Sequence, residues 1–508
     1  MKQYTVTLLP QNIMLSADPG ESLMELLRRA GAAPDAPCGG QGTCGKCRVF
    51  VNGIRQLACQ TAVTGDITVH LPEKSANEQI LTAGIPIHTA VSPVCPGAYH
   101  LAYDIGTTTV ACYLLDGQTG QICAKASTHN PQSTFGADVI SRIRHALHGQ
   151  CTALTASIRD AMETLCRQVC EAAAANADHI GTVAVVGNPC MQQLFLGISP
   201  ENLSAIPFAP VLTATQVLSC REYLPLCENA QLLVVPDISG YVGADTVACL
   251  LSCRMYDHAE MALLVDIGTN GEMVLGNRDR MIACSTAAGP ALEGANIRFG
   301  MRGMNGAIDR VWLEDQRLCC HVIGDVPATG ICGSGLVDAV AVMLALGALN
   351  ERGRIQTPES APLAAAYLKE AEGQRVFCLT DHIYLTQQDI RQLQLAKGAI
   401  AAGIEMMCAC MGLTPDAISQ VYLAGAFGNA IQPQSAAKIG LIPEGFCKKI
   451  TAIGNAAGSG AQLLALRKDV FLLTDRLVQG IDHLELASRE DFQEIFVENM
   501  YFPTKTGE

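Results

Sequence analysis

The stretch "CGGQGTCGKC", residues 38–47, decides how the N-terminal part of this chain folds. Its glycines are spaced as in a dinucleotide-binding fingerprint and, together with Lys46, as in most of a phosphate-binding P-loop. Its three cysteines, Cys38, Cys44 and Cys47, are spaced as ligands of a metal centre. The residues that follow the loop decide among these interpretations.

Those residues argue against both nucleotide motifs. Each motif has to open a helix, because the helix N-terminus receives the phosphates. The stretch "RVFVNGIRQLACQT", residues 48–61, instead alternates apolar and polar side chains around an Asn-Gly turn signal, which is typical of two strands joined by a turn. A P-loop also needs a Ser or Thr hydroxyl after its lysine, and here Cys47 follows Lys46.

A fourth cysteine, Cys59, completes the spacing C-x5-C-x2-C-x11-C. Plant-type ferredoxins have C-x4-C-x2-C and a distant fourth cysteine, and the additional residue in the first gap resembles bacterial and mitochondrial ferredoxins. Four thiolates can also bind zinc, but zinc sites usually pair two short cysteine knuckles, and this segment has one. The spacing therefore favours a [2Fe–2S] cluster, with glycines that let the backbone curl and direct N–H groups at the sulfurs.

The segments around the loop predict a ferredoxin domain over residues 1–74. Residues 2–18 are expected to form two strands around a turn at residues 10–12, and residues 20–31 a short amphipathic helix. A last strand is expected at residues 66–73. Strands, helix, cluster loop and strands follow one another in the β-grasp order of a plant-type ferredoxin.

The overall composition of the 508 residues argues against several classes of function. A net charge of −14 without a basic run argues against nucleic acid as a partner. No signal peptide precedes the first strand, and the longest apolar run, residues 335–349, contains Asp338 and is expected to be a buried helix. All but four of the 23 cysteines lie outside the cluster motif and are expected to be reduced core residues, which fits a cytoplasmic and anaerobic location.

Two similar hairpins point to a nucleotide site. The stretch "HLAYDIGTTTVACYLL", residues 100–115, contains an apolar strand, Asp104, a Gly-Thr-Thr-Thr turn and a returning strand, and "MALLVDIGTNGEMVLG", residues 261–276, repeats the pattern around Asp266. Each turn offers glycine N–H groups and threonine hydroxyls to phosphates, and an aspartate at the strand end can hold hydrated Mg²⁺ or orient water. The repeat indicates an internal duplication that binds a nucleoside triphosphate.

Further glycine-rich turns follow apolar segments. The stretch "TGICGSGLVDAV", residues 329–340, places glycines just before a helix, where an anion can bind. Glycines also follow strands in "VAVVGNPCMQQLFLG", residues 183–197, "QVYLAGAFGNAI", residues 420–431, and "TAIGNAAGSGAQLLAL", residues 451–466. Tight strand–helix packing would explain each of them alone, but their order as a set favours a binding site.

This order of motifs resembles the actin-like ATPase and sugar-kinase superfamily. The Asp104 turn resembles its first phosphate motif, the Asp266 turn its second, and "AGAFGN", residues 424–429, its adenosine motif. The stretches "VVGNPC" and "IGNAAGSG" occupy the places of the two connecting helices at the hinge between lobes. The implied fold class combines α+β and α/β: an N-terminal β-grasp ferredoxin followed by two ribonuclease-H-like lobes that close on ATP.

A plant-type ferredoxin fused to such an ATPase resembles the ATP-dependent reductive activators of corrinoid proteins. The resemblance covers essentially the whole chain and includes "NPQSTFGADVISRI", "PDISGYVGADT" and "AAGPALEGANIRFGMRG". The chain departs from the family near Gln192 and Gln193, where a histidine is expected, and it lacks the C-terminal [4Fe–4S] modules of some activators. The role of an imidazole there is therefore open.

The resemblance implies that the protein reduces the cob(II) form of a corrinoid protein in a methyltransferase system to cob(I). Plant-type clusters reach only about −400 mV, and cob(I) formation requires a lower potential. ATP binding and hydrolysis must therefore supply the difference, and a two-lobed clamp provides the two states that nucleotide can shift.

The same resemblance assigns the expected site residues. The cluster ligands are Cys38, Cys44, Cys47 and Cys59, while Asp104 and Asp266 position Mg²⁺ and water. The residues expected to contact the nucleotide are Gly106, Thr107, Thr108, Thr109, Gly268, Thr269, Asn270, Gly271, Gly333, Ser334, Gly335, Gly425, Gly428 and Asn429. Asp138 and Arg142 lie on an expected helix, where a surface ion pair and a role toward nucleotide or partner are both open.

The expected organisation is a ferredoxin domain at residues 1–74, a linker at 75–98 with a short helix at 78–83, a first ATPase lobe at 99–255 and a C-terminal ATPase domain at 256–508. The expected partners are a transiently bound corrinoid protein and an upstream electron donor, with neither nucleic acid nor a membrane. The sequence leaves open a homodimer, the identity of the corrinoid protein, the methyl donor and the electron donor.

Three other functions fit parts of the sequence. A redox-linked small-molecule kinase would need an aspartate base beside a substrate hydroxyl, and no aspartate stands out for that role. A dehydratase activator resembles the ATPase part, but such activators typically place a [4Fe–4S] cluster between two subunits. A redox-sensing scaffold with a structural nucleotide site would show no ATP turnover when a corrinoid protein is added.

Overall fold

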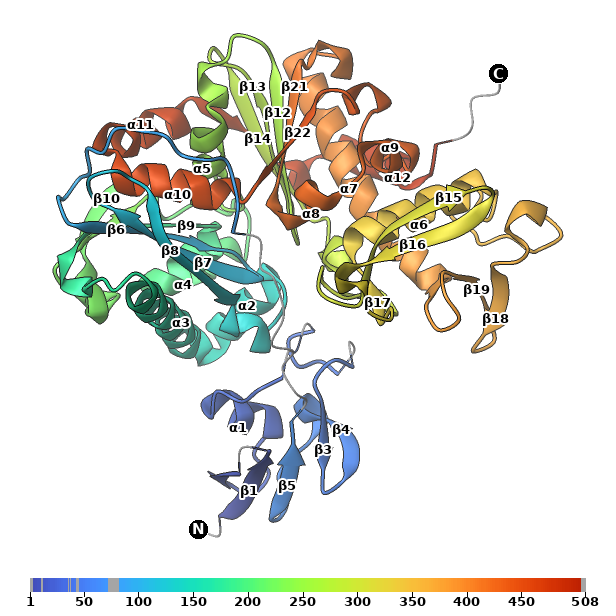
Figure 1. Ribbon diagram of the computed structural model, residues 1–508, viewed down its shortest axis with the longest axis horizontal. Helices are drawn as coiled ribbons and strands as arrows, with labels where there is room; N and C mark the ends of the chain where they lie inside the picture. The colour runs from blue at the N-terminus through green and yellow to red at the C-terminus, as the bar shows by residue number, and fades with distance from the viewer. Residues whose placement is uncertain are drawn as a thin grey trace.

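A computed structural model describes residues 3–10, 12–34, 36, 38–42, 45–71 and 82–503 of the chain. It shows a small N-terminal unit below two larger lobes (Figure 1). Cys44, the second expected cluster ligand, lies outside the described residues, as does most of the short helix expected at residues 78–83.

The N-terminal unit is a five-stranded sheet with one helix. Its strand order is β2-β1-β5-β3-β4, in which β1 and β5 are parallel. Helix α1, Leu23–Arg29, buries Leu23, Leu26 and Leu27 against the sheet, as its amphipathic pattern predicted. The strands are β1 (Tyr4–Leu9), β2 (Ile13–Ala17), β3 (Arg48–Val51), β4 (Ile54–Leu57) and β5 (Ile67–His70). The predicted β-grasp order is confirmed.

Each larger lobe is built on a six-stranded sheet, and both sheets have the same central topology. Three antiparallel strands are followed by two strands parallel to the first of them. The strands of the first lobe are β6 (Tyr99–Ile105), β7 (Thr109–Asp116), β8 (Ile122–His129), β9 (Ile180–Gly187), β10 (Gln216–Ser219) and β11 (Gln231–Val234). Those of the second are β12 (Ala262–Ile267), β13 (Gly271–Gly276), β14 (Met281–Thr286), β21 (Gln420–Ala424), β22 (Ile450–Gly454) and β23 (Ile481–His483). The internal duplication is confirmed.

The helices and two small sheets complete the lobes. Helices before residue 260 are α2 (Val139–His145), α3 (Cys151–Ala172), α4 (Pro189–Leu196) and α5 (Ala244–Cys253). Later ones are α6 (Gly333–Ala345), α7 (Gln387–Met411), α8 (Gly425–Ala430), α9 (Pro433–Lys438), α10 (Ala456–Leu466), α11 (Lys468–Gln479) and α12 (Glu490–Met500). The small sheets contain β15 (Ala307–Glu314), β16 (Arg317–Val322), β17 (Gly330–Ile331), β18 (Leu368–Ala371), β19 (Gln374–Cys378) and β20 (Tyr384–Thr386).

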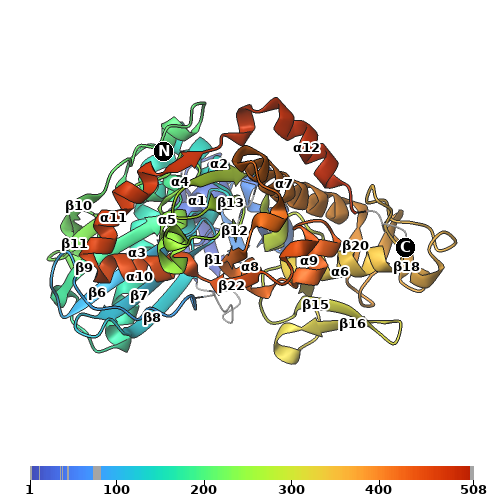
Figure 2. The ribbon, with the colours of Figure 1, turned by 90° about the horizontal axis from the view of Figure 1, so that it is seen from above.

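Helix α7 is the one helix of the described residues that is long and apolar enough to cross a membrane by length and composition. Most of its apolar window is buried, and α12 lies along it when the protein is seen from above (Figure 2). The helix is therefore the central core helix of the second lobe. The apolar run at residues 335–349 corresponds to α6, which is buried as predicted.

Two helices join the lobes. Helix α10, although it follows the second lobe's strands in the chain, lies on the first lobe's sheet beside α5 (Figure 1). The apolar cluster around this pair contains residues of both sheets, including Ala184 and Leu264. The prediction for "IGNAAGSG" is confirmed, but the prediction for "VVGNPC" is wrong, because α4 packs in the first lobe's own core and α5 takes the position at the hinge. Locally, both α4 and α5 follow a glycine, so the sequence pattern does not distinguish them.

The described part of the expected linker, residues 82–98, packs against the ATPase lobes and does not run free. The Tyr113 hydroxyl donates to the Thr82 carbonyl at 2.9 Å, and the Ser459 hydroxyl donates to the Ile85 carbonyl at 2.9 Å. The Lys468 backbone N–H, at the start of α11, donates to the Ser92 carbonyl at 2.7 Å. Residues 82–98 therefore form part of the ATPase lobes and are not a free linker between them and the N-terminal unit.

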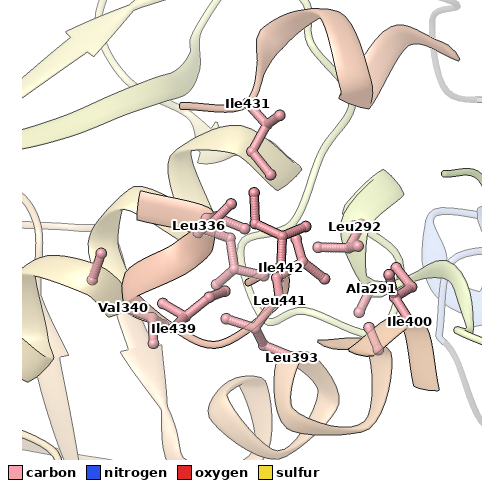
Figure 3. Packing of buried hydrophobic residues seen from close by; sticks show 14 of the residues in the cluster. Ala291, Leu292, Leu336, Val340, Leu393, Ile400, Ile431, Ile439, Leu441 and Ile442 are labelled. Atoms are coloured by element: carbon pink, nitrogen blue, oxygen red, sulfur yellow. The ribbon is translucent and has the colours of Figure 1, made fainter. Parts of the chain in front are cut away.

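The core of the second lobe fixes a short turn, Pro290–Glu293, that faces the first lobe. Ala291 and Leu292 are buried among Leu336, Ile400 and other aliphatic side chains of the core (Figure 3). Because this packing holds the two residues before it, Glu293 has little freedom of position.

We predict that Gly460→Ala destabilises the lobe junction. A Cβ at residue 460 would lie 2.0 Å from the Ala248 carbonyl oxygen, and a helix backbone cannot retreat as a side chain can. The expected cost is about 2 kcal/mol, seen by calorimetry as a fall of about 4 to 8 °C in the thermal midpoint. Gly480→Ala, where the nearest atoms lie at an ordinary 3.5 Å, is the matched control and should leave the midpoint unchanged. Equal midpoints for the two variants would contradict the prediction.

Candidate nucleotide site and cluster loop

The two predicted phosphate turns lie at the ends of equivalent hairpins, and one carboxylate joins them. The Thr108 hydroxyl donates to Glu293 Oε2 at 2.8 Å, and the Thr269 hydroxyl donates to Glu293 Oε1 at 3.0 Å. The two turns therefore lie on opposite sides of the Glu293 carboxylate. The sequence analysis did not identify Glu293, although its place between Gly289 and Gly294 was an available signal.

Two asparagines hold the first turn in place. The Asn130 backbone N–H donates to the Thr108 carbonyl at 2.9 Å, and its side-chain amide donates to the Gly106 carbonyl at 2.8 Å. Asn188, which caps α4, donates to the Thr107 hydroxyl at 3.0 Å. Asn130 therefore occupies the Gly106 and Thr108 carbonyls of the turn, and Asn188 leaves the Thr107 hydroxyl able to donate its own hydrogen.

Arg142 also holds this turn, which decides between the two interpretations of the Asp138–Arg142 helix. The Arg142 side chain is fully buried, and its Nη2 donates to the Thr107 carbonyl at 2.5 Å. Asp138 caps α2 by accepting from the Ser141 N–H at 2.7 Å. The surface ion pair is therefore wrong, because the cap uses the aspartate and the arginine points inward to the hairpin.

Four carboxylates gather where the hairpins meet: Asp104, Asp245, Asp266 and Glu272. Each is half-buried. Asp266 and Glu272 are direct cross-strand neighbours on β12 and β13. Burial, with the nearby charge of Asp245, raises the pKa of Asp104 and of Asp266 to about 7 in each case. Burial also raises the pKa of Asp245 to about 6 and that of Glu272 well above its ordinary value. The hydrogen bonds that the protein offers to these carboxylates therefore offset the cost of burying their charged forms only in part.

The expected adenosine motif lies next to this cluster. Gly425 has φ +81°, and a Cβ there would be 2.8 Å from Asp266 Oδ1, so glycine is required for this close approach. Gly428 packs against Leu423, and Asn429 is exposed at the end of α8. Asn455, the N-cap of α10, hydrogen-bonds the Asp104 carboxylate.

Several other predicted contacts have a packing role. A Cβ at Gly333 would lie 1.9 Å from the Leu292 carbonyl oxygen, and one at Gly335 would lie 2.2 Å from that of Ile308. The Ser334 hydroxyl donates to the Asp309 carbonyl at 2.9 Å. These neighbours explain why the residues are small, and contact with phosphate stays a prediction for all three.

The second turn is closed by the same backbone hydrogen bond as the first turn. The Gly268 N–H donates to the Asn270 carbonyl at 2.9 Å, as the Gly106 N–H does to the Thr109 carbonyl, and Gly271 packs closely on Thr286.

The two glutamines on α4, Gln192 and Gln193, stand where a histidine was expected, and they are 2% and 0% exposed. They lie in the interior of the first lobe and do not reach either turn through a hydrogen bond that the structure shows.

The cysteine loop suits an iron–sulfur cluster. Cys47 Sγ and Cys59 Sγ lie 3.2 Å apart, which is well beyond a disulfide bond of about 2.05 Å and close enough for two ligands of one metal centre. Every glycine of the loop has a positive φ, between 62° and 89°. The Gln60 amide points toward Cys59 Sγ at 3.7 Å. With Cys44 outside the described residues, no three ligating side chains within them are placed to hold a metal.

Most other cysteines are core residues, as predicted. Cys112, Cys190, Cys284 and Cys332 are buried, and among the described residues every cysteine is a free thiol. Burial raises the pKa of Cys190 to about 12, which makes this thiol unreactive at neutral pH.

Comparisons with known proteins cover the whole chain. Residues 6–64 match a 2Fe-2S iron-sulfur cluster binding domain, residues 99–258 the RACo middle region, and residues 260–508 the C-terminal domain of RACo, the ASKHA domain. A solved structure, the reductive activator for corrinoid,iron-sulfur protein, has 26% sequence identity and a TM-score of 0.73, with 98% of each chain covered.

Two curated relatives have similar lengths of match. The corrinoid activation enzyme RamQ of Eubacterium limosum is 34% identical over 483 residues, which are 90% of this chain and 80% of the relative. The [Co(II) methylated amine-specific corrinoid protein] reductase of Methanosarcina barkeri is 27% identical over 439 residues, 78% of this chain and 76% of the relative. This chain, with its [2Fe–2S] domain, middle region and ASKHA domain in that order, therefore belongs to the family of corrinoid activation enzymes.

Proposed function

We propose that this protein couples ATP hydrolysis to the one-electron reduction of a corrinoid protein's cobalt from cob(II) to cob(I). The observation that carries the proposal is the combination, in one chain, of a four-cysteine ferredoxin loop with two phosphate turns joined through Glu293. The RamQ and methylamine-specific relatives, which are named for corrinoid activation and reduction, support this choice of partner.

The chain's own residues have distinct roles in this proposal. Thr107 to Thr109 and Thr269 to Gly271 bind the phosphates of ATP, and α8 supports the adenosine at Gly425 and Gly428. Glu293 holds the two turns together before ATP arrives, and it orients the attacking water once the hydroxyls turn to the phosphates. Lobe closure then depends on which group, carboxylate or phosphate, the hydroxyls bond.

Mg²⁺ fits the carboxylates that surround the turns. Asp104, Asp245, Asp266 and Glu272 repel one another, and a hard divalent cation with oxygen ligands would relieve that repulsion. No group of three ligating side chains among the described residues is close enough for direct binding, so we propose that Asp104 and Asp266 hold hydrated Mg²⁺ through its water ligands.

The N-terminal unit supplies the electron. Cys38, Cys44, Cys47 and Cys59 are the proposed ligands of the [2Fe–2S] cluster, which when bound supplies one electron at a time at low potential. An upstream donor restores that electron, and a cytoplasmic location, expected from the thiol content, stays a prediction.

We predict that Cys47→Ser removes the cluster but not nucleotide binding. Cys47 is fully buried in the core of the N-terminal unit, so no other side chain can take its position. The variant should lose about half or more of its iron and its visible absorbance in anaerobic preparations. The control is Cys410→Ser, an exposed thiol distant in sequence, which should keep both. Wild-type protein that contains stoichiometric zinc in place of iron would contradict the cluster assignment.

We predict that Asp266→Asn impairs both ATP hydrolysis and the reduction of the corrinoid protein that depends on it. The variant should keep the cluster, but ATP hydrolysis and cob(I) formation should both fall about a hundredfold. The spectrum of a corrinoid protein, followed over time with and without ATP, measures cob(I). Asp279→Asn, an exposed aspartate with 76% of its side chain accessible, is the control and should match wild type. Cob(I) formation by Asp266→Asn at the wild-type rate, or by wild type without ATP, would show that the proposal is wrong.

We predict that the nucleotide-free protein becomes less stable as pH rises from about 4 toward 7. The pKa of Asp104 and of Asp266 is raised to about 7 in the folded protein, so the folded state binds more protons than the unfolded state over this range. Asp104→Asn should therefore flatten the fall of the thermal midpoint between about pH 4 and about pH 7, and Asp279→Asn should not. Binding of ATP with Mg²⁺ at pH 7 should release protons from these carboxyl groups, because the cation favours their charged forms. Calorimetry in two buffers of different ionisation enthalpy measures the number of protons released. Proton uptake on binding would contradict the prediction.

A further inference from the structure

One segment of the first lobe, residues 130–145, contacts the first phosphate turn and the N-terminal unit at the same time. We call it the coupling segment. It contains Asn130 and Arg142, which hold the turn, and it ends with His145 at the last turn of α2. Figure 1 shows the N-terminal unit directly below α2.

The first contact of the coupling segment with the N-terminal unit is through Arg28 on α1. Arg28 Nε donates to the Thr134 carbonyl at 2.8 Å, and its Nη2 donates to the same oxygen. The guanidinium lies 4.8 Å from the centroid of the Phe135 ring. The Arg28 side chain is 6% exposed, so both contacts are shielded from solvent.

The second contact is with the cluster loop itself. His145 Nε2 donates to the Gly39 carbonyl at 3.1 Å. A Cβ at Gly39 would lie 3.3 Å from the Phe135 carbonyl oxygen and 3.5 Å from Ser141, so the loop backbone approaches the coupling segment closely. A cavity of about 360 Å³ lies beside this contact, lined by residues of the loop and by Arg144, His145 and His148. Polar contacts around a cavity make a small interface, which is typical of a reversible association between domains.

The coupling segment connects these contacts to the phosphate turn through Arg142. Arg142 Nη2 donates to the Thr107 carbonyl at 2.5 Å, and Nε donates to the Gly136 carbonyl at 3.1 Å. Gly136 directly follows Thr134 and Phe135, the two residues that hold Arg28. A phosphate at the turn would attract the buried arginine, and a movement of Arg142 toward it would displace the Gly136 backbone and with it the acceptor for Arg28.

We propose that the coupling segment makes docking of the N-terminal unit and binding of ATP mutually unfavourable, an inference that rests on the proposed nucleotide site. With the phosphate turn empty, the cluster loop is docked on α2, and this contact covers the loop at Gly39. ATP at the turn releases the loop. Because such coupling is reciprocal, weaker docking raises the affinity for ATP by the same factor.

The first test measures the affinity of the full-length protein for a non-hydrolysable ATP analogue with Mg²⁺. Arg28→Gln and His145→Ala weaken docking from opposite sides, and each should bind the analogue about fivefold more tightly than wild type. His148→Ala is the matched control, because His148 lies on the same cavity and its ring bonds only to the Arg144 carbonyl of its own turn at 2.7 Å. Unchanged or weaker binding by both docking variants would overturn the proposal.

A double variant tests whether Arg142 connects the docking contacts to the phosphate turn. In an Arg142→Lys background, His145→Ala should no longer change the affinity, because the two-directional contact of the guanidinium with Thr107 and Gly136 is lost. A full fivefold change in that background would show that Arg142 does not carry the coupling.

The second test uses wild-type protein and does not depend on how any variant folds. Hydrogen exchange at the amides of residues 24–31 and 39–42 should become faster when the analogue is added, and slower or unchanged exchange would overturn the proposal. Failure of the analogue to bind wild type at all would instead refute the proposed nucleotide site. The two failures are therefore distinguishable.

Discussion

The burial of four carboxylates, Asp104, Asp245, Asp266 and Glu272, where the two hairpins meet is the constraint on which the rest of the ATPase part depends. Several half-buried carboxylates can lie close together only where hydrogen-bond donors or positive partial charges stabilise them. The N-terminus of α5 carries Asp245 in its first turn, and the N-cap of α10 bonds to Asp104, so the two junction helices direct their positive ends at the cluster. Gly425 belongs to the same arrangement, because a Cβ there would lie 2.8 Å from Asp266 Oδ1.

Features that are local in the chain could be predicted from the sequence. The alternation in residues 48–61, the cysteine spacing and the repeated hairpins each depend on neighbours within a few residues, and the structure has these strands and turns where they were expected. The bond between Glu293 and Thr108 could not be predicted this way, because it joins residues 185 positions apart. Arg142 was ambiguous for the same reason, since α2 alone does not show that its inner face meets Thr107. Which helix stands beside α10 at the junction, α4 or α5, also depends on how the two lobes pack.

The structure bears on the competing functions as well. A small-molecule kinase would need an aspartate base that meets a substrate hydroxyl, and Asp237 is the most enclosed aspartate near the carboxylate cluster. Burial and the charge of Asp245 raise its pKa well above the ordinary value, but the residue is only 2% exposed, so a substrate hydroxyl does not reach its carboxylate in this conformation. The match to a corrinoid activation enzyme over 90% of this chain, together with the ferredoxin domain, gives the N-terminal unit a purpose that a kinase or a passive scaffold lacks.

The anchoring of residues 82–98 along α10 and α11 sets a geometric limit on delivery of the electron. The Tyr113 hydroxyl holds the Thr82 carbonyl, so the chain that leads to the N-terminal unit starts from a fixed point on the ATPase lobes. Whatever its conformation, the chain from Leu71 to Thr82 can span at most about 40 Å. A released ferredoxin unit therefore stays within a fixed radius of the lobes at a high local concentration. Under the proposed function, a corrinoid protein would have to bind within that radius of the lobes for its cobalt to be reached, which limits the partner by position as well as by chemistry.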